Sequence, residues 1–277
     1  MTTRHDDALV TEIAAGLRTS LVPSVVRQLA DIEGFLPAIW PQLAPSVDTA
    51  GFLGSALYMA DMALDAVEEV YDEPTLSRES LLAGALSEAD LEQVIAVLDV
   101  FHWLQPQLLL LLAALAEAHE APSVGGQGRP EPREPSEREQ AHQATPVELA
   151  PPDAGLLPEV PAELQLDAPP DLYRAIAVWP GYFEAVWDEL QHLVAYPLFR
   201  QRGRALYFYA RSSSRFLAVP LRADEAALRE AGMRPYAISE ARAIVERALP
   251  AVATMMMHCT AMRAGLGLRE REVVRDE

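Results

Sequence analysis

The chain has 277 residues, half of them hydrophobic, which is enough for one or two domains with a sizeable core. Its formal net charge of −19 argues against binding to nucleic acid or to an anionic membrane, because both need clustered basic side chains. The single cysteine, Cys259, excludes a disulfide within the chain and a C-x-x-C redox pair, and we expect a cytoplasmic protein.

Ala and Leu dominate the composition, and the apolar residues recur at helical spacing, so we expect an all-α protein. Ser87-Glu88-Ala89-Asp90 predicts a capping box, and Pro106 and Pro250 each predict the first turn of a new helix. In chain order, the predicted helices cover residues 7–20, 24–32, 35–43, 51–71, a short stretch to 83, a stretch opening at 87, 106–118, 171–178, 181–195, 202–217, 223–231, 238–248 and 250–264.

An internal repeat runs through the chain. A shift of 147 residues aligns the following pairs: Pro23 with Pro170, Ser24 with Asp171, Arg27 with Arg174, Gly34 with Gly181, and Trp40 with Trp187. Each copy ends in a helix that is apolar all round, at 106–118 and 250–264, and such a helix must be covered on every side. We therefore predict two tandem helical repeats that form an intramolecular pseudo-dimer around these two helices.

The repeat divides the chain into five parts. Residues 120–167 and their borders hold eleven of the 22 prolines and show no clear core-forming period, so we expect a long Pro-rich linker that is partly disordered. The predicted parts are a leader helix at 1–20, a first repeat at 21–119, the linker at 120–167, a second repeat at 168–265 and a charged tail at 266–277.

Common catalytic signatures are absent from the sequence. There is no G-x-S-x-G, no phosphate-binding Gly-rich loop and no H-E-x-x-H. The six histidines are scattered without the spacing of metal ligands, and His102 and His258 are expected to lie in the core.

Two polar residues stand where the repeat copies differ. Asp171 takes the place of Ser24, and Gln105 takes the place of a residue near Leu249, each at a predicted helix start. Asp and Ser are both favoured N-caps, so a purely structural role is one interpretation of Ser24 and Asp171. A functional role for Asp171 and Gln105 is the other, and the residues alone leave both open.

Several segments are similar to one known family. The stretch from Leu21 to Trp40, the run from Val97 to Pro106, the segment Ser123-Val124-Gly125-Gly126, and Asp171 followed by Trp179-Pro180 resemble, in order and spacing, the group I (D,L-) 2-haloacid dehalogenases, also called the DehI-type or halocarboxylic acid dehydrogenase family. The resemblance spans about residues 21–265, apart from the linker.

This resemblance implies an all-α pseudo-dimer with its active site between the repeats. It implies hydrolysis of short 2-haloalkanoic acids to 2-hydroxy acids with inversion at C2, without metal, cofactor or ester intermediate. The family's catalytic Asp falls on Asp171 and its water-orienting Asn on Gln105; pocket positions fall on Ser24, Pro170 and Arg247, where the family has an aromatic residue, a Ser and a Tyr.

The expected partner is a small carboxylic acid substrate. We expect no binding to nucleic acid or to a membrane. The sequence leaves open whether the protein forms a homodimer. The substrate carboxylate is expected on backbone N–H groups at a helix N-terminus. The three substituted pocket positions keep a second hypothesis open, namely a helical binding or scaffold homologue that has kept the fold and lost the chemistry.

Overall fold

The computed structural model describes residues 4–71, 76–84, 86–155, 157–164 and 166–272. Within these ranges the chain is mostly helical, and its extended segments form only isolated bridges, between Thr49 and Pro132 and between Val124 and Leu221. The helices are α1 (Arg4–Gly16), α2 (Ser24–Ala30), α3 (Phe35–Val47), α4 (Ala50–Glu68), α5 (Arg78–Gly84), α6 (Glu88–Glu120), α7 (Glu137–Ala144), α8 (Glu159–Leu164), α9 (Asp171–Ile176), α10 (Pro180–Ala195), α11 (Pro197–Ser213), α12 (Glu225–Glu230) and α13 (Pro235–Gly265), with a 3₁₀ turn at Ser214–Phe216. The all-α prediction is confirmed.

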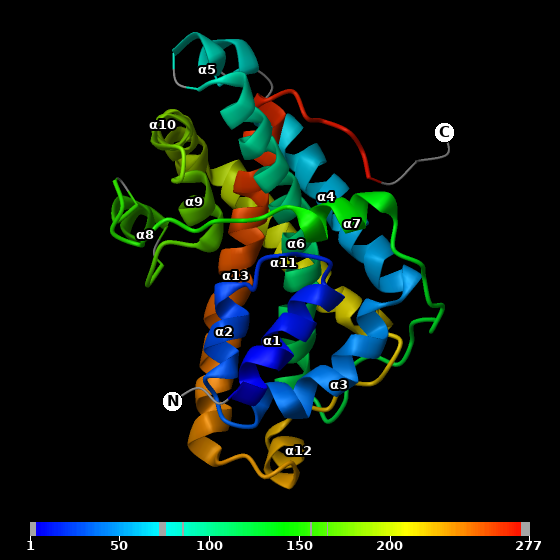
Figure 1. The fold of residues 1–277 in the computed structure, drawn as a ribbon. Coiled ribbons are helices and arrows are strands. Elements are labelled where there is room, and N and C mark those ends of the chain that lie inside the picture. The colour runs from blue at the N-terminus through cyan, green and yellow to red at the C-terminus, as the bar shows by residue number, and fades with distance from the viewer. Residues whose placement is uncertain (1–3, 72–75, 85, 156, 165, 273–277) are drawn as a thin grey trace.

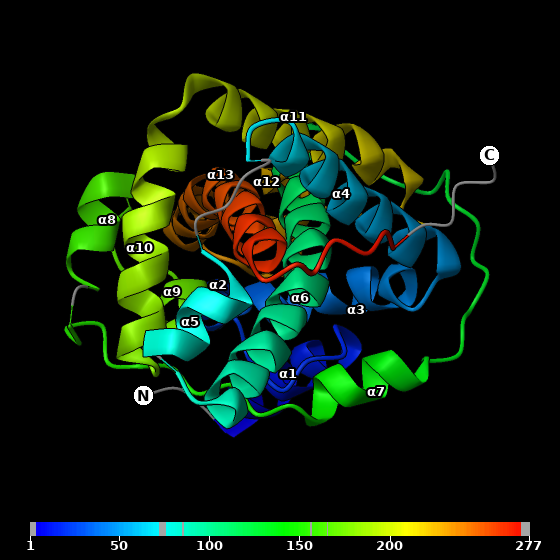
Figure 2. The ribbon, with the colours of Figure 1, turned by 90° about the horizontal axis from the view of Figure 1, so that it is seen from above.

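Two long helices, α6 and α13, lie at the centre of the molecule and pack against each other (Figures 1 and 2). Both α4 and α11 pack on this pair, and α4 and α11 also contact one another. Further contacts cross between the two halves of the chain, since α2 packs on α13 while α9 packs on α6.

The structure corrects the predicted breaks before Pro106 and Pro250. Each proline lies inside one continuous helix, so residues 238–248 and 250–264 belong together in α13, and Ser87 opens a single helix that runs to Glu120. A proline in a helix interior loses one backbone hydrogen bond, at a cost of about 3 kcal/mol. Burial of the flanking residues in the core offsets that cost, and Leu104 and Leu249, for example, are nearly inaccessible.

The local start signal at Ser87 is confirmed. The Ser87 hydroxyl accepts from the Asp90 N–H, and the Asp90 carboxylate accepts from the Ser87 N–H, which is the predicted capping box. From there α6 is long and apolar enough to cross a membrane by composition, yet 78% of its most apolar window is buried inside the protein. It therefore has the surroundings of a core helix.

The predicted linker region, residues 120–167, contains two helices in the structure. One of them, α7, packs on α6, and the His142 ring lies against the Trp103 ring with centroids 5.4 Å apart. At its N-terminus α7 has a second capping box, between Ser136 and Glu139. The segment thus contributes side chains to the core, and the exact division of the chain into repeats stays a prediction.

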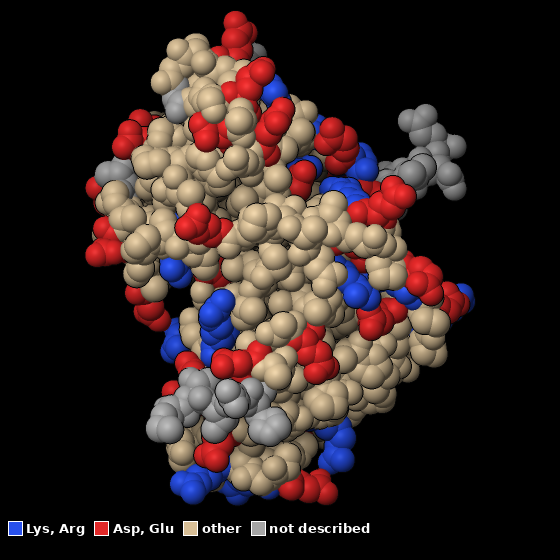
Figure 3. All heavy atoms as spheres, in the orientation of Figure 1, with Lys and Arg blue, Asp and Glu red and all other residues tan. Residues whose placement is uncertain are grey.

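Acidic side chains are scattered over the face drawn in Figure 3, with arginines between them. A hollow opens at the left of this face, beside several basic side chains. In the matching orientation of Figure 1, this position lies between α13 and the loop that follows α8. The cavity described next is lined by residues from both.

Candidate functional site

One cavity of about 370 Å³ is formed where the two halves of the chain meet. Its walls come from the start of α2, the middle of α6, the start of α9 with the segment before it, and the middle of α13. All five residues singled out from the sequence line it: Asp171, Gln105, Ser24, Pro170 and Arg247. Ser24 and Arg247, which are 223 positions apart in the chain, therefore share one cavity.

The carboxylate of Asp171 is bonded directly to its repeat counterpart. The Ser24 N–H donates to Asp171 Oδ2 at 2.7 Å, and the Ser24 hydroxyl donates to Oδ1. Both carboxylate oxygens are thus oriented by one residue from the other half of the chain. The Asp171 side chain remains 14% exposed, so it stays accessible from the cavity.

The prediction that Ser24 and Asp171 are helix N-caps was wrong. Ser24 and Asp171 are the first residues of α2 and α9, the cap positions are Pro23 and Pro170, and neither helix has a side-chain cap bond. Each proline holds an extended conformation before its helix, with ψ of 141° and 154°. The two side chains are therefore free to meet across the interface between the helices.

Gln105 lies in the interior of α6 and is 5% exposed. Its Oε1 is buried and has no hydrogen-bond partner among the described residues. A buried amide oxygen without a partner costs about 1–3 kcal/mol. Gln105 was predicted to lie at a helix start. That prediction was wrong, because α6 continues through Pro106.

Two arginines bring positive charge to the cavity. Arg174 lies one turn after Asp171, with Nη1 4.0 Å from Asp171 Oδ1, and its Nε donates to the Ala150 carbonyl at 2.9 Å. Arg247 is 62% exposed and pairs with the exposed Asp167, with 3.5 Å between Nε and Oδ2. In a chain with 41 acidic residues, these guanidinium groups are the local cationic groups that could attract a carboxylate.

The start of α2 does not offer the backbone anion site that was expected at a helix N-terminus. The Ser24 N–H is already bonded to Asp171, so it has no donor capacity left for a substrate carboxylate. The helix is also only seven residues long. The arginines are consequently the better candidates for that role.

Arg174 and the particular apolar residues of the lining were not singled out from the sequence. The signals were present: Asp171 and Arg174 are three residues apart on one helix, and the α6 residues that face the cavity follow helical spacing. The apolar residues that line the cavity from α6 and α13 are Phe101, Leu104, Leu108, Ile244, Ala248, Ala251, Val252 and Met255.

A buried hydrogen bond anchors α9 to α13 behind the cavity. The Tyr173 hydroxyl and His258 Nδ1 are 2.7 Å apart, and neither side chain is accessible. Burial lowers the pKa of His258 to about 3 and raises the pKa of Tyr173 above its usual range, so both are neutral at physiological pH. This contact fixes the helix on which Asp171 stands.

Sequence comparison finds similarity to one family. A family model described as halocarboxylic acid dehydrogenase DehI matches residues 20–148. A configuration-inverting 2-haloacid dehalogenase of Pseudomonas sp. (strain 113) is 28% identical over 197 residues, which is 68% of this chain and 63% of the relative. A protein of the same description from Alcaligenes xylosoxydans xylosoxydans is 28% identical over 203 residues, 66% of this chain and 64% of the relative. The matched stretch thus spans less than two thirds of these relatives' lengths.

Solved structures show the same fold. A structure described as a complex of D-2-haloacid dehalogenase with L-LA superposes with a TM-score of 0.87 at 19% identity, covering 95% of this chain and 92% of that chain. A mutant of a D-2-haloacid dehalogenase in complex with D-2-CPA gives a TM-score of 0.83 at 18% identity, with the same coverage. The sequence matches and the shared all-α fold agree with the resemblance seen in the sequence, and they support a similarity of this chain to the DehI-type group I 2-haloacid dehalogenases.

Proposed function

We propose that this protein hydrolyses short 2-haloalkanoic acids to 2-hydroxy acids with inversion at C2. The observation that carries the proposal is that Asp171 and Gln105 line one cavity, with Arg174 and Arg247 in the same walls. Support comes from relatives that are described as configuration-inverting 2-haloacid dehalogenases.

The proposed step is direct attack by water. Asp171 accepts a proton from a water molecule while the water oxygen bonds to C2, and the electron pair of the carbon–halogen bond leaves with the halide. No bond forms between Asp171 and the substrate, and no metal or cofactor takes part. A general base of this kind contributes roughly 10²–10⁴-fold to the rate.

The surrounding residues have separate tasks in this proposal. Ser24 holds the Asp171 carboxylate in one orientation through two donated hydrogen bonds. The amide of Gln105 orients the attacking water by a hydrogen bond. Arg247 and Arg174 bind the substrate carboxylate, and the apolar side chains from α6 and α13 surround the halogen. Pro170 shapes the wall just before Asp171.

We also propose that the fold is an intramolecular pseudo-dimer. Three packing pairs support it: α2 on α13 with α9 on α6, α4 on α6 with α11 on α13, and α4 on α13 with α11 on α6. The Ser24–Asp171 contact joins two positions that are 147 apart, which is the repeat shift itself. In this view the site forms near the pseudo-two-fold axis.

The test measures halide release from (R)- and (S)-2-chloropropionate, each assayed separately. Asp171→Asn keeps a side chain that can accept from Ser24, so we expect it to melt near the wild type and to lose halide release by roughly 10²-fold or more. The matched control is Asp188→Asn on α10, an exposed carboxylate outside the cavity, which should remain active. Undiminished activity in Asp171→Asn would remove Asp171 from catalysis.

A single turnover in ¹⁸O-labelled water tests the direct attack. With enzyme in excess over substrate, direct attack places the label in the 2-hydroxy acid during the first turnover. An ester intermediate would instead leave unlabelled product and a labelled Asp171 carboxylate. Mass spectrometry of the product and of the peptide that contains Asp171 distinguishes these outcomes, and a chiral separation of the product reports inversion.

A further inference from the structure

The cavity that contains Asp171, called here the Asp171 cavity, is lined by two carboxylates and two guanidinium groups among the described residues, so their formal charges cancel. The four groups form two pairs. Arg174 Nη1 lies 4.0 Å from Asp171 Oδ1. Arg247 Nε lies 3.5 Å from Asp167 Oδ2. A substrate carboxylate adds a third negative charge, and it therefore competes with a carboxylate of the chain for either arginine that it approaches.

The two carboxylates differ in how firmly they are held. Asp171 accepts two hydrogen bonds from Ser24, and its side chain is 14% exposed. The Asp167 side chain is 88% exposed, and it has no ion pair or hydrogen bond with a described residue other than its pair with Arg247. Exposed ion pairs are weak, because water screens the charges and the side chains lose entropy on pairing. Asp167 is therefore the carboxylate that an entering anion displaces more easily.

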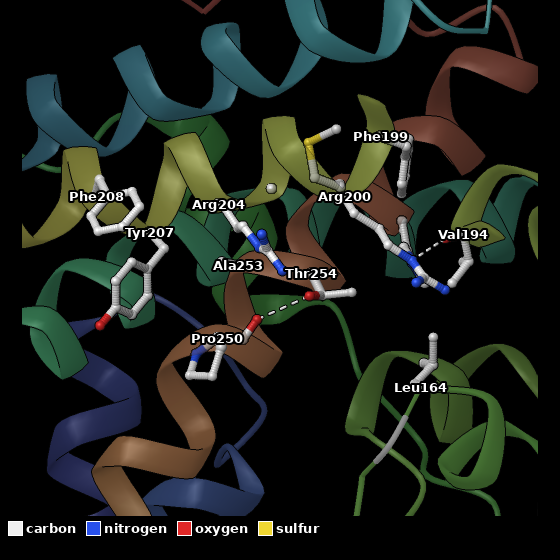
Figure 4. A pocket seen from close by; sticks show the side chains of 13 residues that line it. Leu164, Val194, Phe199, Arg200, Arg204, Tyr207, Phe208, Pro250, Ala253 and Thr254 are labelled. Carbon is white, nitrogen blue, oxygen red and sulfur yellow. Dashed lines mark hydrogen bonds between the residues drawn. The ribbon is translucent and has the colours of Figure 1, made fainter. Parts of the chain in front are cut away.

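A larger cavity, of about 560 Å³, lies between α11 and α13 and has a different lining (Figure 4). Arg200 and Arg204 line it, and among the described residues of its lining none is acidic. Arg200 Nε donates to the Val194 carbonyl at 2.7 Å, and neither arginine has an ion pair with a described residue. An arginine in a cavity wall of this acidic chain thus needs no carboxylate beside it. The acid beside Arg247 is a particular feature of the Asp171 cavity.

We propose that Asp167 is an internal competitor for the substrate carboxylate and thereby sets the affinity of the Asp171 cavity for anions. A bound carboxylate takes the place of Asp167 on Arg247, and the Asp167 side chain turns into the solvent. When the product leaves, Asp167 pairs with Arg247 again, which favours release. This inference rests on the proposed role of Arg247 in binding the substrate carboxylate, but it does not depend on the reaction at C2.

The test follows the Nε–H resonance of Arg174 in protein labelled with ¹⁵N-arginine, assigned by its loss in Arg174→Lys. This N–H donates to the Ala150 carbonyl at 2.9 Å, and Arg174 lines the Asp171 cavity, so its resonance reports on molecules that enter. Titration with propionate, which has no halogen to lose, should shift the resonance saturably. Asp167→Asn should bind propionate roughly two- to fivefold more tightly, as expected when an exposed ion pair no longer competes. Asp167→Glu keeps the carboxylate and should bind as the wild type does.

Three controls separate competition for Arg247 from a general effect of charge. Asp188→Asn removes the same charge from an exposed position of α10 outside the cavity and should leave the affinity unchanged. Propionamide has nearly the shape of propionate without its charge, so Asp167→Asn should not tighten its binding. In the Arg247→Gln background, Asp167→Asn should no longer tighten propionate, because the group under competition is gone.

The assignment would be overturned by the absence of a saturable shift with propionate in both the wild type and Asp167→Asn, or by equal affinities in the two. An equal gain in Asp188→Asn, with propionamide or in the Arg247→Gln background would also overturn it. Halide release from 2-chloropropionate is measured separately. Its absence, with the propionate results as expected, would remove the proposed dehalogenation and leave the role of Asp167 standing.

Discussion

Single side chains show how far the sequence predicts this site. The residues of interest could be chosen from the repeat and from the family resemblance, and Asp171, Gln105, Ser24, Pro170 and Arg247 do line one cavity. The predicted helix-cap role was wrong for Ser24 and Asp171. Local sequence cannot show that two helix starts face each other, and that arrangement is what turns two favoured cap residues into hydrogen-bond partners.

Gln105 provides a prediction at this scale. If its amide orients the attacking water, Gln105→Leu should lower halide release by about tenfold or more, with a small effect on stability because its Oε1 has no hydrogen bond to lose among the described residues. Gln105→Asn should retain activity, since the amide is kept. Both are checked by halide release and by thermal melting.

Gln107 is the matched control for a buried amide. Its Nε2 donates to the carbonyls of Trp103 and Leu17 at 3.0 and 3.4 Å, away from the cavity. Gln107→Leu should therefore cost about 1–3 kcal/mol of stability while each folded molecule keeps its activity. Equal activity in Gln105→Leu and Gln107→Leu would remove Gln105 from the site.

At the scale of helices, apolar periodicity and capping signals predicted most elements to within a few residues. Helix starts were wrongly predicted at Pro106 and Pro250. A proline at a helix start and a proline in a buried helix interior have the same local sequence pattern when the flanking residues are apolar. Burial of the proline and its neighbours in the folded protein decides between a helix start and a helix interior, and local sequence does not predict that burial. The continuous helices α6 and α13 bring Gln105 and Arg247 into the lining of one cavity.

The central helices give the second prediction. Leu110 on α6 and Met256 on α13 are each 3% exposed, so Leu110→Asp or Met256→Asp should unfold the protein, because an unpaired buried carboxylate costs several kcal/mol as an order of magnitude. Tyr236→Asp, at a 62% exposed position of α13, is the control and should fold normally. Circular dichroism and urea unfolding measure the difference. A soluble Leu110→Asp protein with native stability would show that α6 is not central.

For the whole molecule, stability should depend on pH through buried titratable groups. Burial lowers the pKa values of His119 and His142 to about 4 and that of His258 to about 3. Below their usual value of about 6.5, the unfolded chain takes up protons that the folded protein cannot, so stability falls as pH decreases from about 6.5 toward 4.

The Glu272 carboxyl adds a second pH range, at more acidic pH, over which stability falls. Burial acts to raise its pKa, but hydrogen bonds from His102 and Arg138 outweigh burial and hold it at about 2. Its stabilising effect is complete above its usual pKa of 4.5 and is lost as pH falls from there to about 2.

Urea midpoints measured from neutral to acid pH check this prediction, in which one pKa unit corresponds to about 1.4 kcal/mol. His142→Phe keeps an aromatic ring against Trp103 and removes one titrating group, so its stability should fall less between about pH 6.5 and 4. His192→Gln changes an exposed side chain and should leave the profile unchanged. A flat profile in the wild type would contradict the burial of these groups.

The contact between Ser24 and Asp171 has a consequence for how such a site can exist at all. Because these two positions touch, Asp at both would press two carboxylates together and force one to keep its proton, whereas Ser at both would leave no base. An assembly of two identical subunits can offer only those symmetric choices. Joining the halves into one polypeptide removes the restriction, since each half can then mutate independently. A pair made of one acceptor and one donor therefore requires the two positions to differ, as Ser24 and Asp171 do in this chain.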